Sequence, residues 1–172
     1  MNKVLFLDFD GPLFPERANV FHTNKFPVPK EITEVDIKGI ISYWKMDPIA
    51  VTMLNSLMEL HQFDTVVSSS WRIVVDKPSI LALFKANNLN LELHKDWETR
   101  SITGGRGVEI KDWLGRHPEY KNRYVILDDP WSGGDVEDGL FKQEQIVLVD
   151  PHNGIDFFSF KQLIEAMANW YK

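Results

Sequence analysis

The sequence predicts an α/β protein of the three-layer, Rossmann-like class, in which helices cover both faces of a mostly parallel, five-stranded sheet. Two features of the chain lead to this prediction. Apolar runs of strand length recur along the sequence, and segments with helical periodicity separate most of them. Continuous apolar runs are typical of strands that are buried on both faces, and alternation with helices is typical of parallel sheets.

The first strand is expected at residues 4–7, where Asp8 ends an uninterrupted apolar run. Asp47 and Pro48 then provide an N-cap and a first-turn proline for a helix. The apolar stripe of this helix contains Ala50, Leu54, Leu57, Met58 and His61. A second strand follows at residues 65–68 and ends in a cluster of serines.

Pro78 opens the next helix, and an edge strand is expected after it. The buried side of this helix is expected to consist of Ile80, Leu81, Leu83 and Phe84. The edge strand is expected over residues 89–93, because leucines at positions 89, 91 and 93 alternate with polar residues. Such alternation indicates a strand that is buried on one face only.

Helical spacing continues over residues 107–117, and Pro118 ends that helix. Its apolar positions are Ile110, Trp113 and Leu114. The remaining strands are expected at residues 124–127 and 146–149, which are both continuous apolar runs. A last helix has an apolar stripe of Phe160, Leu163, Ile164, Met167, Trp170 and Tyr171.

The length of 172 residues favours a single domain over residues 1–172, since domains commonly contain roughly 100–200 residues. Residues 12–46 do not fit the pattern, because they contain several prolines and no long apolar period. Long connections without regular structure are uncommon in compact domains and are often lids or binding loops. We therefore expect residues 12–46 to form a small cap or lid inserted after the first strand.

The composition excludes several classes of function. The chain contains no cysteine, which excludes disulfides, thiolate metal sites and cysteine nucleophiles. Its net charge of −6 argues against a long nucleic-acid-binding surface, which needs a basic stripe. The apolar run at residues 4–7 is too short for the core of a signal peptide or for a membrane span. We expect a soluble, cytoplasmic protein with no membrane partner.

Acidic and hydroxyl side chains follow three of the predicted strands. The first strand ends in Asp8-Phe9-Asp10-Gly11, the second in Ser68-Ser69-Ser70, and the fourth in Asp128-Asp129-Pro130. Arg106 lies in a glycine-rich turn before the helix that leads into the fourth strand. In parallel sheets the ligand crevice lies beyond the carboxyl ends of the strands. These residues are therefore expected to form one site.

The acidic residues of this site indicate a hard divalent cation. Carboxylates gathered at one edge of a sheet repel one another unless a cation lies among them. Oxygen donors without His or Cys favour Mg²⁺, which typically takes one or two protein carboxylates together with a substrate phosphate. Asp8 with either Asp128 or Asp129 fits that requirement.

The same residues suit phosphate chemistry. The Ser68 hydroxyl, the backbone N–H groups of residues 69–70 and the cationic Arg106 would hold a phosphate. With the charge neutralised, the carboxylate of Asp8 can attack phosphorus and form an aspartyl-phosphate. Asp10 could protonate the leaving oxygen and later take a proton from the hydrolytic water, which is typically worth ~10²–10⁴-fold in rate.

These motifs resemble those of the haloacid dehalogenase (HAD) superfamily of phosphotransferases. The matching features are Asp8-Phe9-Asp10-Gly11 after an apolar strand, a strand ending in Ser68, the basic Arg106, and an apolar run that ends in two aspartates at 125–129. The resemblance implies a central first strand in the sheet order 5-4-1-2-3, a Mg²⁺ cofactor and phosphomonoester hydrolysis. It also implies that Ser68 and Arg106 hold the phosphate.

The resemblance further implies the roles of the four aspartates. Asp8 would be the nucleophile and a Mg²⁺ ligand, and Asp10 the acid–base residue whose backbone carbonyl also binds the metal. Asp129 would ligate Mg²⁺, with Asp128 beside it. Which of these last two aspartates ligates the metal directly is open at this point.

Two further assignments are open. Lys111 is an alternative to Arg106 as the phosphate-binding cation, because the superfamily more commonly has a lysine there. Three consecutive serines also leave open whether Ser68 or its neighbour Ser69 binds the phosphate.

Ser69-Ser70-Trp71-Arg72 and residues 106–114 are similar to a narrower HAD group, which occurs in nucleic-acid-repair proteins and as stand-alone phosphatases. We therefore expect the substrate to be a nucleotide or a 3′ or 5′ phosphate end of a nucleic acid. Trp71 and Arg72 are candidates for stacking on or clamping the leaving group, although a core position is an equal alternative for Trp71.

Two other functions use the same residues. A metal-dependent nuclease would activate water with the acidic cluster and cleave diesters without a covalent intermediate. A non-catalytic phosphate-binding module is the second alternative. The presence of both Asp8 and Asp10 argues against it, since binding needs only one of them.

Overall fold

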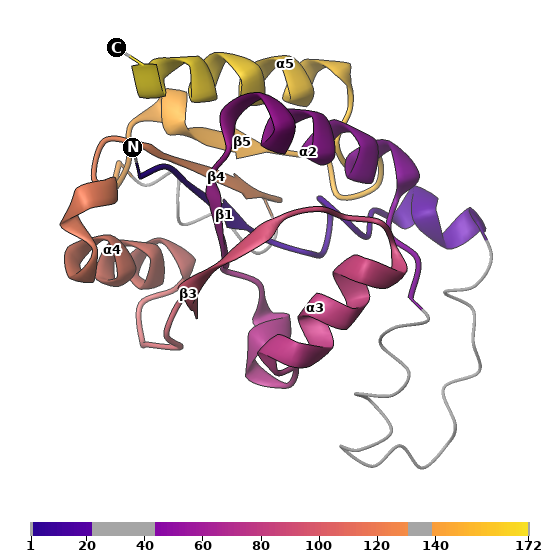
Figure 1. Ribbon diagram of the computed structural model, residues 1–172, viewed down its shortest axis with the longest axis horizontal. Helices are drawn as coiled ribbons and strands as arrows, with labels where there is room; N and C mark the ends of the chain where they lie inside the picture. Colours follow the sequence, from indigo (N-terminus) through magenta and orange to yellow (C-terminus); the bar gives the residue numbers. More distant parts are fainter. Residues whose placement is uncertain (1, 22–43, 131–138, 172) are drawn as a thin grey trace.

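The sheet has five parallel strands in the order β3-β2-β1-β4-β5, so β1 lies at its centre. The computed structural model describes residues 2–21, 44–130 and 139–171, and helices flank the sheet in it (Figure 1). The strands are β1 Val4–Leu7, β2 Asp64–Val67, β3 Glu92–Glu98, β4 Tyr124–Asp128 and β5 Ile146–Leu148. Counted from β5, this is the order 5-4-1-2-3, so the predicted Rossmann-like α/β fold is confirmed.

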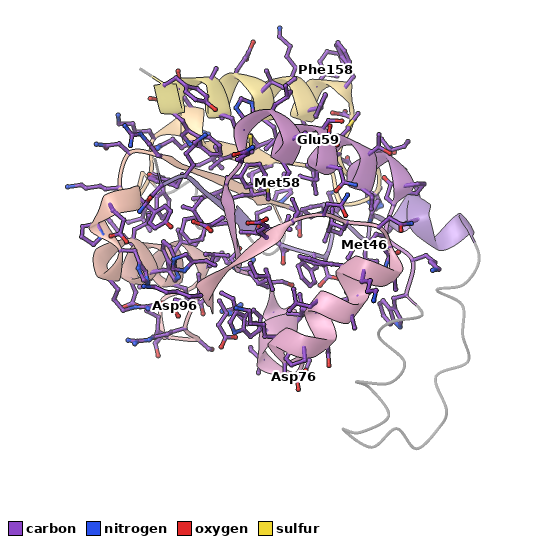
Figure 2. All side chains as sticks on the ribbon, viewed as in Figure 1. Met46, Met58, Glu59, Asp76, Asp96 and Phe158 are labelled. Atoms are coloured by element: carbon purple, nitrogen blue, oxygen red, sulfur yellow. The ribbon has the colours of Figure 1, made fainter. Side chains whose placement is uncertain are left out.

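Within the described residues, three α-helices cover one face of the sheet and a fourth covers the other. The helices are α2 Pro48–His61, α3 Lys77–Ala86, α4 Arg106–Arg116 and α5 Phe157–Ala168. In those same ranges, none of them has the length and hydrophobicity needed to cross a membrane. Figure 2 shows side chains filling both sides of the sheet, whereas Phe158 points outward from α5.

The side chains of β1 alternate between the two faces of the sheet and thereby contribute to two hydrophobic cores. Leu5 and Leu7 pack with buried residues of α2, α3 and α5, whereas Val4 and Phe6 pack with buried residues of α4. Successive side chains of a strand point to opposite faces, so a central strand that is covered on both sides must be apolar throughout. This explains why the first strand could be recognised from a continuous apolar run.

Aspartate N-caps begin three of the helices. The side chains of Asp47, Asp76 and Asp156 each accept a hydrogen bond from a backbone N–H two or three residues later, at 2.8–3.1 Å, and thereby start α2, α3 and α5. An N-cap of this kind satisfies one of the backbone donors that the first turn leaves free. The predicted start of α2 at Asp47 and Pro48 is confirmed.

The edge strand lies further along the chain than predicted. Its pairing with β2 begins at Glu92, opposite Asp64, and continues to Glu98. Leu89 and Leu91 are buried in the larger core but precede the strand. Alternating leucines report which side chains are buried, whereas the register of the backbone decides which residues pair.

Three residues assigned to apolar stripes are exposed. Leu81 is 44% exposed, Ile164 is 40% exposed and Tyr171 is 58% exposed. Each of them lies at the margin of a helix face whose central residues are buried. The predicted stripes were therefore wider than the faces that pack on the sheet.

Much of the predicted cap or lid at residues 12–46 lies outside the described residues, because the structure does not describe residues 22–43. The two described ends of this segment are joined. The backbone N–H of Asp47 donates to the carbonyl of Leu13 at 2.9 Å, and Nε of Arg17 donates to the Asp47 carboxylate at 3.1 Å. Arg17 lies in the short helix η1 Glu16–Phe21 and also donates to the carbonyl of Ile155 at 3.0 Å. The chain therefore leaves and rejoins the domain at neighbouring points.

Candidate active site

Three carboxylates from the two central strands meet at the carboxyl edge of the sheet. Asp8 follows β1, Asp128 is the last residue of β4, and Asp129 follows it. The parallel register pairs the strand ends Leu7 and Leu127, which places the next residues side by side. One carboxylate oxygen of each aspartate lies within 4.8 Å of the others, and all three residues are buried. The structure thus brings together the acidic residues that were predicted to surround a cation.

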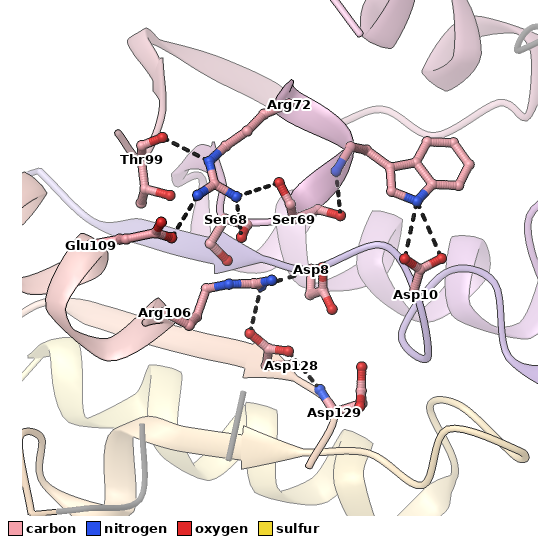
Figure 3. Close-up of polar contacts among 11 residues, drawn as sticks. Asp8, Asp10, Ser68, Ser69, Arg72, Thr99, Arg106, Glu109, Asp128 and Asp129 are labelled. Atoms are coloured by element: carbon pink, nitrogen blue, oxygen red, sulfur yellow. Dashed lines mark hydrogen bonds and ion pairs between the residues drawn. The ribbon is translucent and has the colours of Figure 1, made fainter. Parts of the chain in front are cut away.

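Arg106 neutralises part of this negative charge. Its Nη1 atom lies 2.9 Å from Oδ2 of Asp128 and 3.3 Å from Oδ1 of Asp8 (Figure 3). Burial lowers the pKa of Arg106, but the charges of the two aspartates outweigh this effect and raise it above its ordinary value. Lys111, the alternative cation, is exposed on α4. The cation at this site is therefore Arg106.

One arginine does not balance three buried carboxylates. Burial raises the pKa of Asp128 well above its ordinary value, and the charge of Asp8 raises it further, while Arg106 opposes both. The two oxygens of Asp128 already accept hydrogen bonds from Arg106 and from the backbone N–H of Asp129, at 2.9 and 2.8 Å. Buried like charges are costly unless a cation compensates them, and an all-oxygen donor set suits Mg²⁺. The residues present fit a divalent cation.

Gly11 allows Asp129 to lie close to the turn that follows Asp10. Its φ of +79° is in the left-handed region, where side chains other than glycine are strained. A Cβ atom at this position would lie 2.8 Å from Cβ of Asp129, closer than real side-chain contacts allow. The glycine of the Asp-x-Asp-Gly motif thus serves both the turn and the packing of the acidic cluster.

The carboxylate of Asp10 lies at the exposed side of the site. The indole N–H of Trp71 donates to both of its oxygens, with N–O distances of 3.2 and 3.1 Å. Partial desolvation raises the pKa of Asp10, the charge of Asp8 raises it further, and the Trp71 N–H opposes the change. Trp71 packs against other aromatic rings, including a parallel stack on Phe14. Trp71 therefore belongs to an aromatic cluster and also contacts the predicted acid–base residue.

The three serines after β2 differ in their surroundings. Oγ of Ser68 is buried and has no hydrogen-bond partner among the residues that the structure describes, and Figure 3 shows this side chain beside Arg106 and Asp8. Oγ of Ser69 accepts from the backbone N–H of Trp71 at 3.3 Å and caps the short helix η4 Ser70–Ile73. Ser70 is exposed. A buried hydroxyl without a partner is rare and costly, and this distinguishes Ser68 from the other two serines.

Arg72 is placed differently from what a substrate clamp requires. Its guanidinium is buried and forms an ion pair with Glu109, and Nε donates to the carbonyl of Thr99 at 2.7 Å. Nη1 donates to the carbonyls of Ser68 and Ser69 at 2.9 and 2.5 Å. Burial lowers the pKa of Arg72, and the charge of Glu109 opposes this change. Arg72 thus stabilises the turn that contains Ser68 and Ser69, and its guanidinium does not face a ligand.

Glu109 was missed as a residue that supports the site. Its other carboxylate oxygen accepts from the backbone N–H of Ile102 at 3.3 Å, so it also fixes the loop before α4. A signal existed in the sequence, because Glu109 lies one helical turn before Trp113 on the apolar side of the predicted helix. A glutamate on a buried face needs a cationic partner, and Arg72 was an unpaired candidate for it.

The comparisons with known proteins agree with these features. Residues 4–157 match the family described as the HAD domain in Swiss Army Knife RNA repair proteins. None of the curated proteins matches this sequence.

The solved structures give a weaker likeness. A crystal structure from Thermotoga maritima, described as that of a beta-phosphoglucomutase, aligns with a TM-score of 0.48 and 17% sequence identity, over 99% of this chain and 97% of the other. That likeness is too weak to bear on the activity. The family match covers most of the chain, and the chain therefore belongs to the family of HAD domains found in Swiss Army Knife RNA repair proteins.

Proposed function

We propose that this protein is a Mg²⁺-dependent phosphomonoesterase that acts through an aspartyl-phosphate on Asp8. One observation carries the proposal: three buried carboxylates lie within 4.8 Å of one another, beside Arg106 and the unpartnered hydroxyl of Ser68. The membership in a HAD family supports phosphoryl transfer as the general class of reaction.

Asp8 and Asp129 would hold the Mg²⁺ directly, together with the backbone carbonyl of Asp10. Asp128 would remain beside them, because its oxygens already accept hydrogen bonds from Arg106 and from the Asp129 backbone. When bound, the metal would offset the negative charges of the carboxylates and of the phosphate.

In the first step, an oxygen of Asp8 attacks phosphorus, and the bond from phosphorus to the ester oxygen breaks. The leaving oxygen takes a proton from Asp10. The hydroxyl of Ser68 and the guanidinium of Arg106 donate hydrogen bonds to the remaining phosphate oxygens. Fixed donors of this kind stabilise the charge that develops in the transition state.

In the second step, water attacks the phosphorus of the aspartyl-phosphate, and Asp10 takes the proton that the water loses. Inorganic phosphate leaves, and the carboxylate of Asp8 is restored. Asp10 therefore acts first as an acid and then as a base.

For the substrate we propose a nucleotide or a 3′ or 5′ phosphate end of a nucleic acid. The family description, which names RNA repair proteins, supports this class. The net charge of −6 favours a small nucleotide or a chain end over extended contact with a polymer, because polymer binding gains from the neutralisation of many phosphates.

The test is a phosphatase assay with p-nitrophenyl phosphate, mononucleotides and oligonucleotides that carry a 3′ or 5′ phosphate. Phosphate release should require Mg²⁺, stop with EDTA and disappear in Asp8→Asn. Lys111→Ala, which changes an exposed cation on α4, serves as the matched control and should retain activity. Radiolabelled phosphate should be trapped on wild-type protein and released by hydroxylamine.

Other results would contradict the proposal in distinct ways. Cleavage of diesters alone, with no trapped label, would identify the protein as a nuclease. Phosphate binding without turnover in the presence of Mg²⁺ would identify a binding module. Unchanged turnover in Asp8→Asn would exclude this aspartate as the nucleophile.

A further inference from the structure

The carboxylate of Asp10 is held by a residue from a different strand end. The indole N–H of Trp71 is shared between the two carboxylate oxygens, at 3.2 and 3.1 Å, as Figure 3 shows. These are the side-chain hydrogen bonds that Asp10 makes within the described parts of the chain. The two residues are 61 positions apart, so the bond links the turn after β1 to the turn after β2.

The indole itself is fixed by packing on several sides. The ring of Phe14 stacks on it with centroids 4.9 Å apart and an interplanar angle of 9°. Trp44 meets it edge-on at 5.1 Å, and Phe9 meets it edge-on at 5.6 Å. A nucleobase therefore cannot stack on the face of the indole that Phe14 covers. The packing also holds the indole N–H in one direction.

The backbone of Trp71 is fixed as well. Its N–H donates to Oγ of Ser69, and its carbonyl accepts from the N–H groups of Val74 and Val75 at 3.0 and 2.9 Å. The next residue, Arg72, ties the same turn to Glu109. A donor anchored at both its ring and its backbone imposes its direction on the carboxylate of Asp10, which accepts both hydrogen bonds.

We infer that Trp71 is a positioning residue, which orients the carboxylate of Asp10 for proton transfer to the leaving group. This inference rests on the proposed function. It replaces the stacking role expected for Trp71 with a role that is exerted through Asp10. If the carboxyl group of Asp10 points elsewhere, it contributes little to the rate, because proton transfer requires the donor within hydrogen-bond reach of the leaving oxygen.

The role predicts a specific dependence on the leaving group. Loss of the hydrogen bond should slow the reaction of esters whose alcohol needs a proton, and should spare esters whose leaving group departs as a stable anion. Benzyl phosphate, an alkyl ester, and p-nitrophenyl phosphate, an aryl ester with a stable leaving anion, form a suitable pair of probes, because each carries one benzene ring and the two are of similar size. The value of kcat/KM is the right quantity, because it covers only the steps up to release of the alcohol.

Trp71→Phe keeps an aromatic ring in the cluster and removes the N–H. We expect kcat/KM for benzyl phosphate to fall by roughly 10- to 100-fold, a part of the ~10²–10⁴-fold that acid–base catalysis supplies. The value for p-nitrophenyl phosphate should change by less than about threefold. In Asp10→Asn, adding Trp71→Phe should cause no further loss with benzyl phosphate, because Trp71 acts through the residue already disabled.

Trp113→Phe is the matched control, since it removes an indole N–H that donates to the carbonyl of Asp96, in the core beneath α4. It should show no selective loss with benzyl phosphate. Phe14→Leu provides a second variant, which loosens the stack but retains the N–H. It should give a smaller loss with the same preference, and it tests the inference even if Trp71→Phe does not fold.

The outcomes separate the inference from the proposed function. Equal losses with the two esters, or additive losses in the double variant, would overturn the role of Trp71 while the phosphatase activity stands. Wild-type protein that releases phosphate from neither ester, and from none of the mononucleotides and phosphate-ended oligonucleotides, in the presence of Mg²⁺ would overturn both.

Discussion

Arg72 and Glu109 form a buried ion pair, with Nη2 and Oε2 2.5 Å apart, that joins the turn carrying Ser68 to the helix carrying Arg106. The guanidinium of Arg72 also donates to the carbonyl of Ser68 at 2.9 Å, and Glu109 lies three residues after Arg106 on α4. The pair thus fixes the distance between the two groups that would hold a phosphate. The geometry of the site therefore depends on two charged residues, Arg72 and Glu109, that support it from outside the acidic cluster.

Glu109→Ala should lower the stability markedly. The substitution leaves the guanidinium of Arg72 buried without its partner, which typically costs about 3–5 kcal/mol. For a chain of this size we expect the melting temperature to fall by roughly 10 °C. Glu165→Ala, which breaks an exposed pair with Lys161 on α5, should change it little. A similar small change in both variants would contradict a structural role for the buried pair.

Ser68→Ala should weaken phosphate binding without lowering stability. Within the described parts of the chain its hydroxyl has no partner to lose, so the free energy of unfolding should stay the same or rise. Removal of a hydrogen bond to a charged ligand should raise the inhibition constant of inorganic phosphate by roughly 10- to 100-fold.

Ser69→Ala is the comparison for this stability measurement, because it removes the cap of η4 and should cost about 1 kcal/mol in urea denaturation. If Ser68→Ala proves the more destabilising of the two, its hydroxyl has a structural role instead.

Gly11→Ala should impair the response to Mg²⁺. Its Cβ would collide with Asp129, and the left-handed φ adds about 1–2 kcal/mol of strain. We expect a higher Mg²⁺ concentration for half-maximal phosphatase activity and a lower melting temperature.

Gly115→Ala is the matched control, because no atom of the described residues lies within 4 Å of the Cβ that it would add on α4. It should stabilise the helix by about 0.5–1 kcal/mol and leave the Mg²⁺ dependence unchanged. An unchanged Mg²⁺ response in Gly11→Ala would show that the close approach to Asp129 does not position the metal site.

Asp156 should make the stability depend on pH in the acid range. The backbone N–H of Ser159 donates to its carboxylate and lowers its pKa below the ordinary value of 3.8. The folded chain therefore holds this proton less tightly than the unfolded chain does. The stabilisation is present above the ordinary pKa and is lost as the pH falls through the lower, folded value.

Asp156→Ala should consequently cost about 1 kcal/mol at neutral pH and progressively less in strong acid. Asp156→Asn keeps an oxygen for the N-cap and should remove the pH-dependent part alone. Urea denaturation at a series of pH values measures both variants. A cost for Asp156→Ala that is constant across the acid range would show that the carboxylate does not stabilise the cap through its charge.

The parts of the fold that the sequence predicts are those with a local cause. The apolar run of β1 and the Asp47–Pro48 start of α2 each depend on neighbouring residues, and both were correctly located. The beginning of β3 depends on pairing with a strand almost 30 positions earlier, at Asp64↔Glu92, which alternation of side chains does not encode. The prediction of that strand was consequently displaced toward the N-terminus.

The same distinction holds for the candidate site. The grouping of Asp8, Asp128 and Asp129 was predictable because parallel strands end at one edge. The direction of a long side chain was not, since the partner that turns Arg72 away from the crevice lies 37 positions later on α4. The different surroundings of Ser68, Ser69 and Ser70 also required the structure, because burial and capping separate serines that are adjacent in the sequence.

The bond between Leu13 and Asp47 closes the base of the insertion, so the sheet and its helices are joined independently of the intervening chain. Loops of different length can be spliced between such adjoining ends at a small entropic cost. An exchange of the segment between these ends would therefore leave Asp8, Asp128 and Asp129 where the two central strands place them. The position of the acidic cluster is in this sense independent of the sequence that joins Leu13 to Asp47.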